Sequence, residues 1–196
     1  MKKSLLVFLA LVLVFLFLFT GCGETDTVNY LAKLAKKDYS EIALTETVTV
    51  GGDTLTSTVT VKNEKKVSYI AYAVETLNEI GFLEAPTTDR TVKTGSVTVK
   101  KGKIIEQNGV EVENIDFPAL SGVGMKFSDT FFADVVWQDG KFEAKVTDPA
   151  GFFGKTDFSA DNMRVTVLYG ESLDRITVTY KTSDGASVTA DYTFTA

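Results

Sequence analysis

The clearest pattern in the chain is an alternation of apolar and polar residues between positions 44 and 61. The apolar positions are Leu44, Val48 and Val50 in a first run and Leu55, Val59 and Val61 in a second. Threonine fills most positions between them, and Gly51-Gly52-Asp53 separates the runs. Because the side chains of a strand point alternately to its two faces, this pattern predicts a β-hairpin with one apolar face.

The same alternation returns near the end of the chain in three runs. Their apolar positions are Met163, Val165, Val167 and Tyr169, then Ile176, Val178 and Tyr180, then Val188, Ala190, Tyr192 and Phe194. Threonine again occupies many opposite positions, at Thr166, Thr177, Thr179, Thr189 and Thr193. The pattern predicts three further strands with one apolar face.

Glycine turns separate other short runs that suit strands. Lys101-Gly102 lies between residues 96–99 and Ile104-Ile105, and Asp139-Gly140 lies between residues 135–137 and 142–146. Asp184-Gly185 lies between the last two alternating runs. Such dipeptides favour the tight turns of hairpins, so a mostly antiparallel sheet is expected.

Residues 64–80 leave two structures open. Val67, Ile70, Val74 and Leu77 follow helical spacing, and Gly81 is suited to end a helix, whereas the valines and tyrosines of this segment also suit a strand. Seventeen residues are many for one strand and ordinary for a helix. We therefore expect a helix here, with a strand as the alternative.

A shorter helix is predicted from Val28 to about Lys37. Thr27 can cap its first turn, and Leu31, Leu34 and Ala35 fall on one face of it.

From residue 114 to residue 128 the periodicity fades, and Pro118 indicates a loop or a broken helix. An apolar sheet face needs a cover, which helices can supply. The sequence thus predicts an α+β domain, in which a mostly antiparallel, hairpin-rich, curved sheet has one face covered by one to three helices.

The first residues indicate export from the cytoplasm. Lys2 and Lys3 precede an apolar run from Leu5 to Phe19, and the small or polar Thr20 and Gly21 then lead to Cys22. This order is typical of a secretory signal. The run is shorter than the ~20 apolar residues that span a bilayer, so a cleaved signal is favoured over a transmembrane anchor.

Phe19-Thr20-Gly21-Cys22 resembles the lipobox of bacterial lipoproteins, although most lipoboxes have leucine where this chain has Phe19. The resemblance implies cleavage between Gly21 and Cys22 and a lipid on the Cys22 sulfur. It also implies attachment to the cell membrane on its extracytoplasmic face. The expected organisation is a signal peptide at 1–21, a short tether at 22–27 and a single domain at 28–196.

Charge and composition exclude several functions. Without Lys2 and Lys3 the chain keeps 18 basic and 26 acidic residues, a net charge of −8, so nucleic acid is not an expected partner. Lysines do cluster at 33–37, 62–66 and 100–103, which we interpret as solvated faces and turn tips. The first cluster lies close to Cys22 and could contact lipid head groups.

The chain contains no histidine and one cysteine. Imidazole is the commonest general base and a frequent zinc ligand, and one cysteine forms neither an internal disulfide nor a cysteine metal cluster. No catalytic residue, metal site or cofactor is predicted, and the chain is not expected to be an enzyme.

Aromatic residues form the most distinctive remaining motif. They are Phe131, Phe132 and Trp137, and Phe152 and Phe153 between Gly151 and Gly154. The favoured interpretation is that they fill the core from loops. The functional alternative is that they contact an apolar ligand, lipid or a partner.

Three functions remain open on sequence alone. The first is a membrane-anchored binding or structural lipoprotein whose partner is a ligand or another envelope protein. The second is a carrier that holds lipid or another hydrophobic ligand between sheet and helices. This arrangement is distantly similar to lipoprotein-carrier folds, in which a curved, unclosed sheet lies over helices. The third is a hydrolase that uses a pair of carboxylates.

Overall fold

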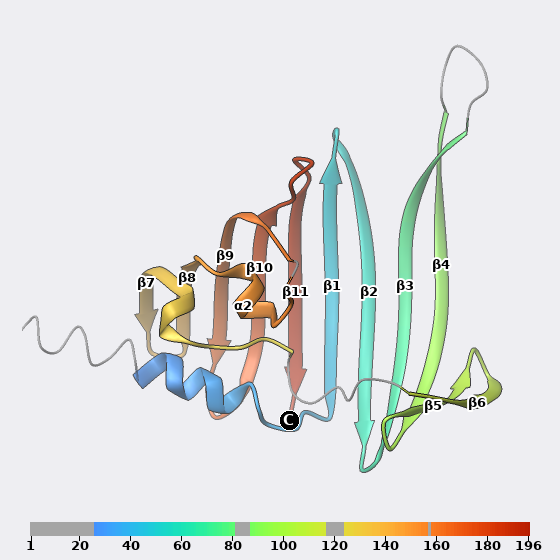
Figure 1. Ribbon diagram of the computed structural model, residues 1–196, viewed down its shortest axis with the longest axis horizontal. Coiled ribbons are helices and arrows are strands. Elements are labelled where there is room, and N and C mark those ends of the chain that lie inside the picture. Colours follow the sequence, from blue (N-terminus) through green and yellow to red (C-terminus); the bar gives the residue numbers. More distant parts are fainter. Residues whose placement is uncertain (1–25, 81–86, 117–123, 157) are drawn as a thin grey trace, which may run out of the picture.

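The described residues form an open antiparallel sheet of eleven strands (Figure 1). The computed structural model describes residues 26–80, 87–116, 124–156 and 158–196. The spatial order of the strands is β6-β5-β4-β3-β2-β1-β11-β10-β9-β8-β7. The strands are β1 (Glu41–Val50), β2 (Asp53–Glu64), β3 (Val67–Ile80), β4 (Thr87–Lys100), β5 (Lys103–Gln107), β6 (Val110–Asp116), β7 (Phe132–Gln138), β8 (Lys141–Val146), β9 (Asp161–Tyr169), β10 (Leu173–Lys181) and β11 (Ser187–Thr195).

The prediction of an antiparallel, hairpin-rich sheet is confirmed, but the fold is mostly β rather than α+β. The described residues contain only a helix at residues 26–34, the short helix α2 (Pro149–Phe153) and the single 3-10 turn η1 (Asp129–Phe131). The first helix begins and ends earlier than predicted. Turns occur as predicted at Gly51-Gly52, Lys101-Gly102, Asp139-Gly140 and Asp184-Gly185.

The hydrophobic core lies between the helices and one face of β8 to β11 (Figure 1), which we call the helix-side face. Side chains that point to this face alternate along each strand, as the pattern predicts. The fully buried ones include Phe142, Ala144, Met163, Val165, Val167, Leu173, Ile176, Val178 and Ala190, together with Leu31 and Leu34 from the first helix and Phe152 from α2.

Local interactions explain why a helix of only five residues forms at α2. Asp148 caps it by accepting a hydrogen bond from the Gly151 amide at 2.8 Å, and Pro149 occupies the first turn. Gly154 ends the helix in the left-handed region, with φ of 61°. These interactions hold Phe152 in the core.

Strands β1 to β4 carry the sheet away from the helices. The register from β11 through β1 to β4 shows which side chains of these strands point to the same side as the helix-side face. We call this side of β1 to β4 the open face. It comprises Ile42, Leu44, Glu46, Val48, Leu55, Ser57, Val59, Val61, Ile70, Tyr72, Val74, Lys93, Gly95 and Val97. The opposite face is rich in threonine, including Thr45, Thr47, Thr58, Thr60, Thr94 and Thr98.

No helix covers the open face in the part of the chain that the structure describes (Figure 1). Among the side chains described in β1, β2 and β3, none is buried; β4 has one, Val99. Within the described residues, the four strands therefore form a single layer, and the side chains on its apolar side are mostly half-buried.

The helix predicted for residues 64–80 is wrong: this segment ends β2 and forms β3, a strand of fourteen residues. Its length has a structural cause, because β3 pairs with β4 along its whole length but with β2 only from Val67 to Val74. The remainder belongs to a two-stranded ribbon that leaves the sheet. The valines and tyrosines of this segment thus correctly indicated a strand, whereas the length of the segment wrongly favoured a helix.

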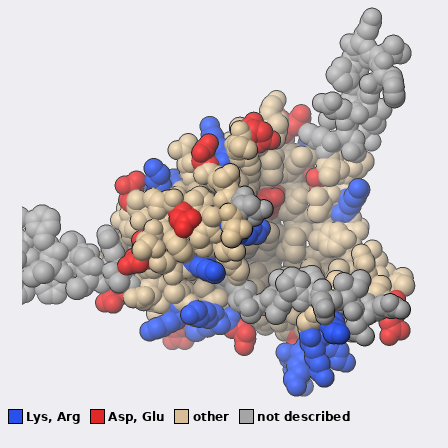
Figure 2. All heavy atoms as spheres, in the orientation of Figure 1, with Lys and Arg blue, Asp and Glu red and all other residues tan. Residues whose placement is uncertain are grey.

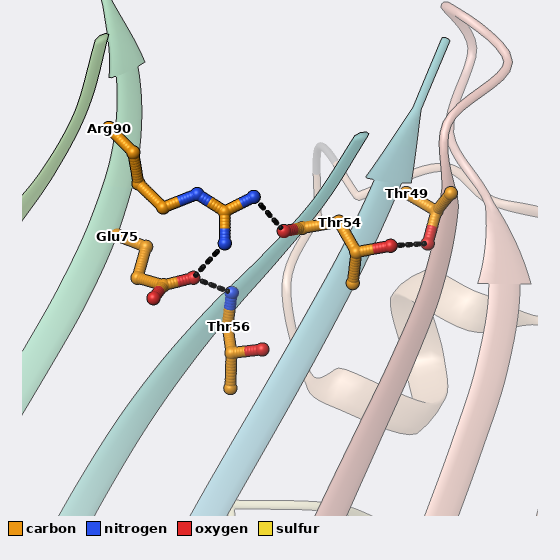
Figure 3. Close-up of polar contacts among 5 residues, drawn as sticks. All are labelled: Thr49, Thr54, Thr56, Glu75 and Arg90. Carbon is orange, nitrogen blue, oxygen red and sulfur yellow. Dashed lines mark hydrogen bonds and ion pairs between the residues drawn. The ribbon is translucent and has the colours of Figure 1, made fainter. Parts of the chain in front are cut away.

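A polar clip closes the point where the ribbon departs from β2 (Figure 3). The Glu75 carboxylate accepts a hydrogen bond from the Thr56 amide at 2.7 Å and lies 3.8 Å from the Arg90 guanidinium. Arg90 also donates to the Thr54 carbonyl at 2.9 Å. Side chains of the ribbon therefore satisfy backbone groups of β2 that β3 no longer pairs. Beside the clip, the Thr49 and Thr54 hydroxyls are 3.3 Å apart across the β1–β2 hairpin.

The segment at 114–128, predicted as a loop or broken helix, falls into three parts. Its first residues end β6, residues 117–123 lie outside the described residues, and residues 124–128 form no helix or strand.

Substitution of Gly95 tests the packing of the open face. A methyl group at Gly95 would overlap with the Tyr72 hydroxyl, so Gly95→Ala must displace the Tyr72 side chain. We expect the free energy of unfolding, measured by urea titration, to fall by about 1–3 kcal/mol. Gly170→Ala is the matched control, because nothing lies within 4 Å of that position. Equal stability of the two variants would contradict the packing of Tyr72 over Gly95.

Candidate functional site

The lipidation site predicted at Cys22, with its cleavage position at Gly21, lies outside the described residues. The described chain begins four residues later, in the helix at residues 26–34. No helix in the described segments is long and apolar enough to span a membrane.

The predicted aromatic contacts are mostly parts of the core. Phe152 is fully buried, and Phe131, Phe132 and Phe153 are partly buried against the same cluster. Rings from separate segments meet edge to face: Phe132 lies 5.3 Å from Phe142 and 5.9 Å from Phe152 between centroids. The contacts continue from Phe152 through Phe153 and Phe158 to Tyr180 on β10. This placement agrees with the core interpretation of these four phenylalanines.

Trp137 differs from the other aromatic residues of this group. It lies on β7, an edge strand of the sheet, and is 43% exposed next to the 53% exposed Val136. It is therefore available for contact, but it lies at the far side of the sheet from the open face.

The open face is a candidate for binding on the described part of the molecule. Two of its rows across β1 to β4 contain no charged residue: Ile42, Val61, Ile70 and Val97 form one, and Leu44, Val59, Tyr72 and Gly95 form the other. Val74 at its centre is 36% exposed. Figure 2 shows few charged atoms on the front of these strands. Contiguous apolar surface of this kind marks interaction sites in soluble domains.

Glu46 marks the boundary between the core and the open face. It is opposite Ala190 of β11 on one side and Ser57 of β2 on the other. Burial, with a smaller contribution from the Glu46 charge, raises the pKa of Tyr192 to about 12. The same two causes raise the pKa of Tyr180. Both phenols therefore stay neutral at physiological pH, and Glu46 forms none of the ion pairs found among the described residues.

A second surface is positively charged although the protein as a whole is acidic. The turns after β2 and after β4 are adjacent, since the Lys101 amide donates to the Lys66 carbonyl at 3.4 Å. This arrangement joins two lysine clusters that are separate in sequence. We call it the lysine end; it comprises Lys62, Lys65, Lys66, Lys100, Lys101 and Lys103. Figure 2 shows the lysines gathered there, below the sheet.

A groove of about 660 Å³ opens at the lysine end, lined among others by Lys65, Lys66 and Lys101 and by the polar Asn63 and Ser68. Glu41 lies 3.6 Å from Lys62, so part of the charge is compensated. The exposed lysines suit an anionic surface, although Asp38, Tyr39 and Val99 also line the groove.

The first helix lies at the same end of the strands as the lysine end (Figure 1). Its Tyr30 hydroxyl donates to the Gly170 carbonyl at 2.8 Å in the β9–β10 turn, and Lys37 donates to the Glu171 carbonyl. Lys33 and Lys36 of this segment are exposed. All three lysine clusters seen in the sequence thus occupy one end of the molecule.

No group of three or more residues suited to hold a metal ion occurs among the described residues. The described side chains also include no buried polar or charged residue.

Comparison with known proteins gives no family. No family model and no curated protein matches the chain. Among solved structures, the chain is similar to the dehydratase domain from the CurF module of curacin polyketide synthase, with 8% sequence identity. The match covers 86% of this chain and 81% of that chain at a TM-score of 0.21. A likeness at that score carries no argument about fold or activity.

Sequence reasoning missed both the open face and the lysine end as units. The apolar alternation in β1 and β2 was visible, but the extent of the face depends on β3 and β4. The adjacency of Lys66 and Lys101 requires β3 to be a strand, because only a strand returns the chain to the same end. The Lys101-Gly102 turn was the available signal.

Two aromatic substitutions test the roles assigned above. Phe152→Ala removes a fully buried ring, so we expect the free energy of unfolding to fall by about 3–5 kcal/mol in urea titrations. Trp137→Ala is the matched aromatic control on an exposed position and is expected to change it by about 0.5 kcal/mol or less. A Phe152→Ala variant as stable as Trp137→Ala would show that α2 does not contribute to the core.

Proposed function

We propose that the protein is a lipid-anchored lipoprotein on the extracytoplasmic face of a cell membrane, where one folded domain serves a binding role. The observation that carries the proposal is Cys22 itself. It follows an apolar run and Thr20-Gly21, in the order of a lipobox, and stands just ahead of the first described helix.

The short tether supports a location of the domain close to the bilayer. Four residue steps separate Cys22 from Asp26, which reach about 14 Å when fully extended. A diacylglyceryl group on Cys22 supplies two acyl chains, and two chains make attachment lasting where one gives only reversible binding.

The lysine distribution supports one orientation on that membrane. The first helix and the lysine end share one end of the strands, so the chain leaves the tether at the positively charged end. A lysine close to an anionic leaflet contributes about 1 kcal/mol of attraction. The strands then stand away from the bilayer.

The binding role rests on the open face. A single layer with an apolar side exposes surface that a domain without a partner would be expected to bury. An envelope protein that presents its own apolar surface fits this role, and no catalytic residue is needed for it.

The carrier hypothesis receives less support from the described residues. The space between α2 and β8 to β10, where a lipid would lie, is filled by Phe152 and its aromatic neighbours. For the hydrolase hypothesis, no observation brings two carboxylates into one cleft. We therefore propose neither.

Intact-mass analysis of the membrane fraction tests the anchor. The native chain is expected to start at Cys22 and to carry the added mass of a diacylglyceryl group, because the lipidated sulfur holds the chain in the bilayer. Cys22→Ser is expected to lack this mass and to be depleted from membranes after cell fractionation. The matched control Thr25→Ser, three residues later, should remain lipidated. A native chain that keeps Met1 and an unmodified thiol would contradict the proposal.

A further inference from the structure

The open face carries one charge of each sign, and the register places both in one row. Glu46 on β1 is opposite Ser57 on β2, which is opposite Val74 on β3, which is opposite Lys93 on β4. Residues opposite each other in antiparallel pairs point to the same face. The row across the open face is therefore acid, polar, apolar, base.

Neither charge is compensated within the described part of the chain. The ion pairs there join Lys62 with Glu41, Arg90 with Glu75 and Lys141 with Glu143. Glu46 and Lys93 lie three strand spacings apart, roughly 14 Å, which is too far for a direct contact. An apolar face with a carboxylate at one side and an ammonium group at the other is complementary to itself.

Two copies of the chain could pair these charges if their open faces packed together around a two-fold axis. This axis would run parallel to the strands, midway between the two sheets and between β2 and β3. It places β1 of one copy over β4 of the other at the same height along the strands. The row of one copy then lies opposite the same row of the second copy in reverse order. Glu46 of each copy therefore faces Lys93 of the other, which gives two such pairs per dimer. Two sheets packed face to face lie about 10 Å apart, which these two long side chains can bridge between them.

The fourteen residues of the open face determine its area. Each covers about 33 Å², because strands lie ~4.8 Å apart and every second residue, ~6.8 Å along a strand, points to this face, so together they present a flat area of roughly 460 Å². Two copies would together bury about 920 Å² of flat area, which places the dimer at the low end of the range for specific interfaces. The threonine-rich opposite face suits solvent, which agrees with a cover on one side only.

We propose that a second copy of this chain covers the open face, in a two-fold sandwich of β1 to β4 held in register by the pairs of Glu46 with Lys93. This proposal identifies the partner of the open face. The choice of axis rests on the proposed function, because it assumes that both copies are anchored in a membrane. This axis keeps the first helices and the lysine ends of both copies at one end, so both can be anchored in one bilayer. A two-fold axis perpendicular to the strands would put them at opposite ends.

Charge reversal tests the register of the dimer. The full lipidated chain is extracted from membranes in a non-ionic detergent, and native mass spectrometry gives its dimer fraction. Glu46→Lys and Lys93→Glu are each expected to lower that fraction several-fold, because each places like charges opposite each other. The double variant Glu46→Lys with Lys93→Glu is expected to restore it, because it recreates both pairs in reverse.

Neighbouring residues on the opposite face supply matched controls. Thr47→Lys and Thr94→Glu introduce the same charges on the same strands but point away from the proposed interface. They are expected to leave the dimer fraction unchanged. If circular dichroism shows that a single variant is unfolded, the dimer fractions of the double variant and of these controls test the proposal.

Carbodiimide joins a carboxylate to an amine only when the two are in contact, and it can be applied to intact membranes. In the native chain it should produce a dimer on denaturing gels that contains a Glu46–Lys93 peptide. Mixed isotopic labelling should show that this peptide joins two copies.

A native chain that stays monomeric in both measurements overturns the proposal, and so does a double variant no more dimeric than the single ones. Lipidation of Cys22 is read separately from the intact mass. A lipidated monomer would therefore contradict only the proposed dimer, and a dimer without lipid would contradict only the proposed anchor.

Discussion

The structure depends on the burial of one apolar sheet face that is wider than its helical cover. The described sheet has eleven strands, but α2 and the first helix cover its helix-side face only over β8 to β11. Apolar burial contributes roughly 25 cal/mol per Å², so each strand added beyond the cover adds apolar surface without this gain. The helical cover produces the core, and no helix of the described segments continues this cover over β1 to β4.

The two halves of the sheet thus differ in how they are held. Around β8 to β10, rings from residues 124–128, from α2 and from the strands pack edge to face, and Phe142 and Phe152 are fully buried. In β1 to β4 the backbone ladders and neighbouring side chains stabilise a single layer, and the clip of Glu75 and Arg90 closes its outer end. A second sheet packed on this layer would bury its apolar side as the helices bury that of β8 to β11.

Much of this architecture could be predicted from short-range patterns. Alternation fixed the faces of β1, β2 and β9 to β11, and glycine turns located four hairpin connections, because both signals depend only on neighbouring residues. The strand β3 could not be separated from a helix, since its length comes from pairing with β4 beyond the end of β2. That β1 to β4 form a single layer also depends on where the helices pack. The sequence around residues such as Leu55 or Ile70 does not show whether a helix covers them.

The candidate site divides in the same way. The Cys22 motif is contiguous and was recognised from sequence, although no structural observation tests it. The row that links Glu46 to Lys93 joins residues 47 positions apart through three strand registers, so no local pattern shows it. The aromatic residues were conspicuous in sequence, but the structure uses four of them in packing.

Solvent access to the two faces of β3 tests the cover of the open face most directly. Tyr72 lies on the open face and Tyr69, which is 44% exposed, lies on the opposite face of the same strand. Hydroxyl-radical labelling of the protein in its membranes should oxidise Tyr72 several-fold more slowly than in the Glu46→Lys variant, with Tyr69 unchanged. Equal oxidation of Tyr72 in both proteins would show that the open face has no such cover.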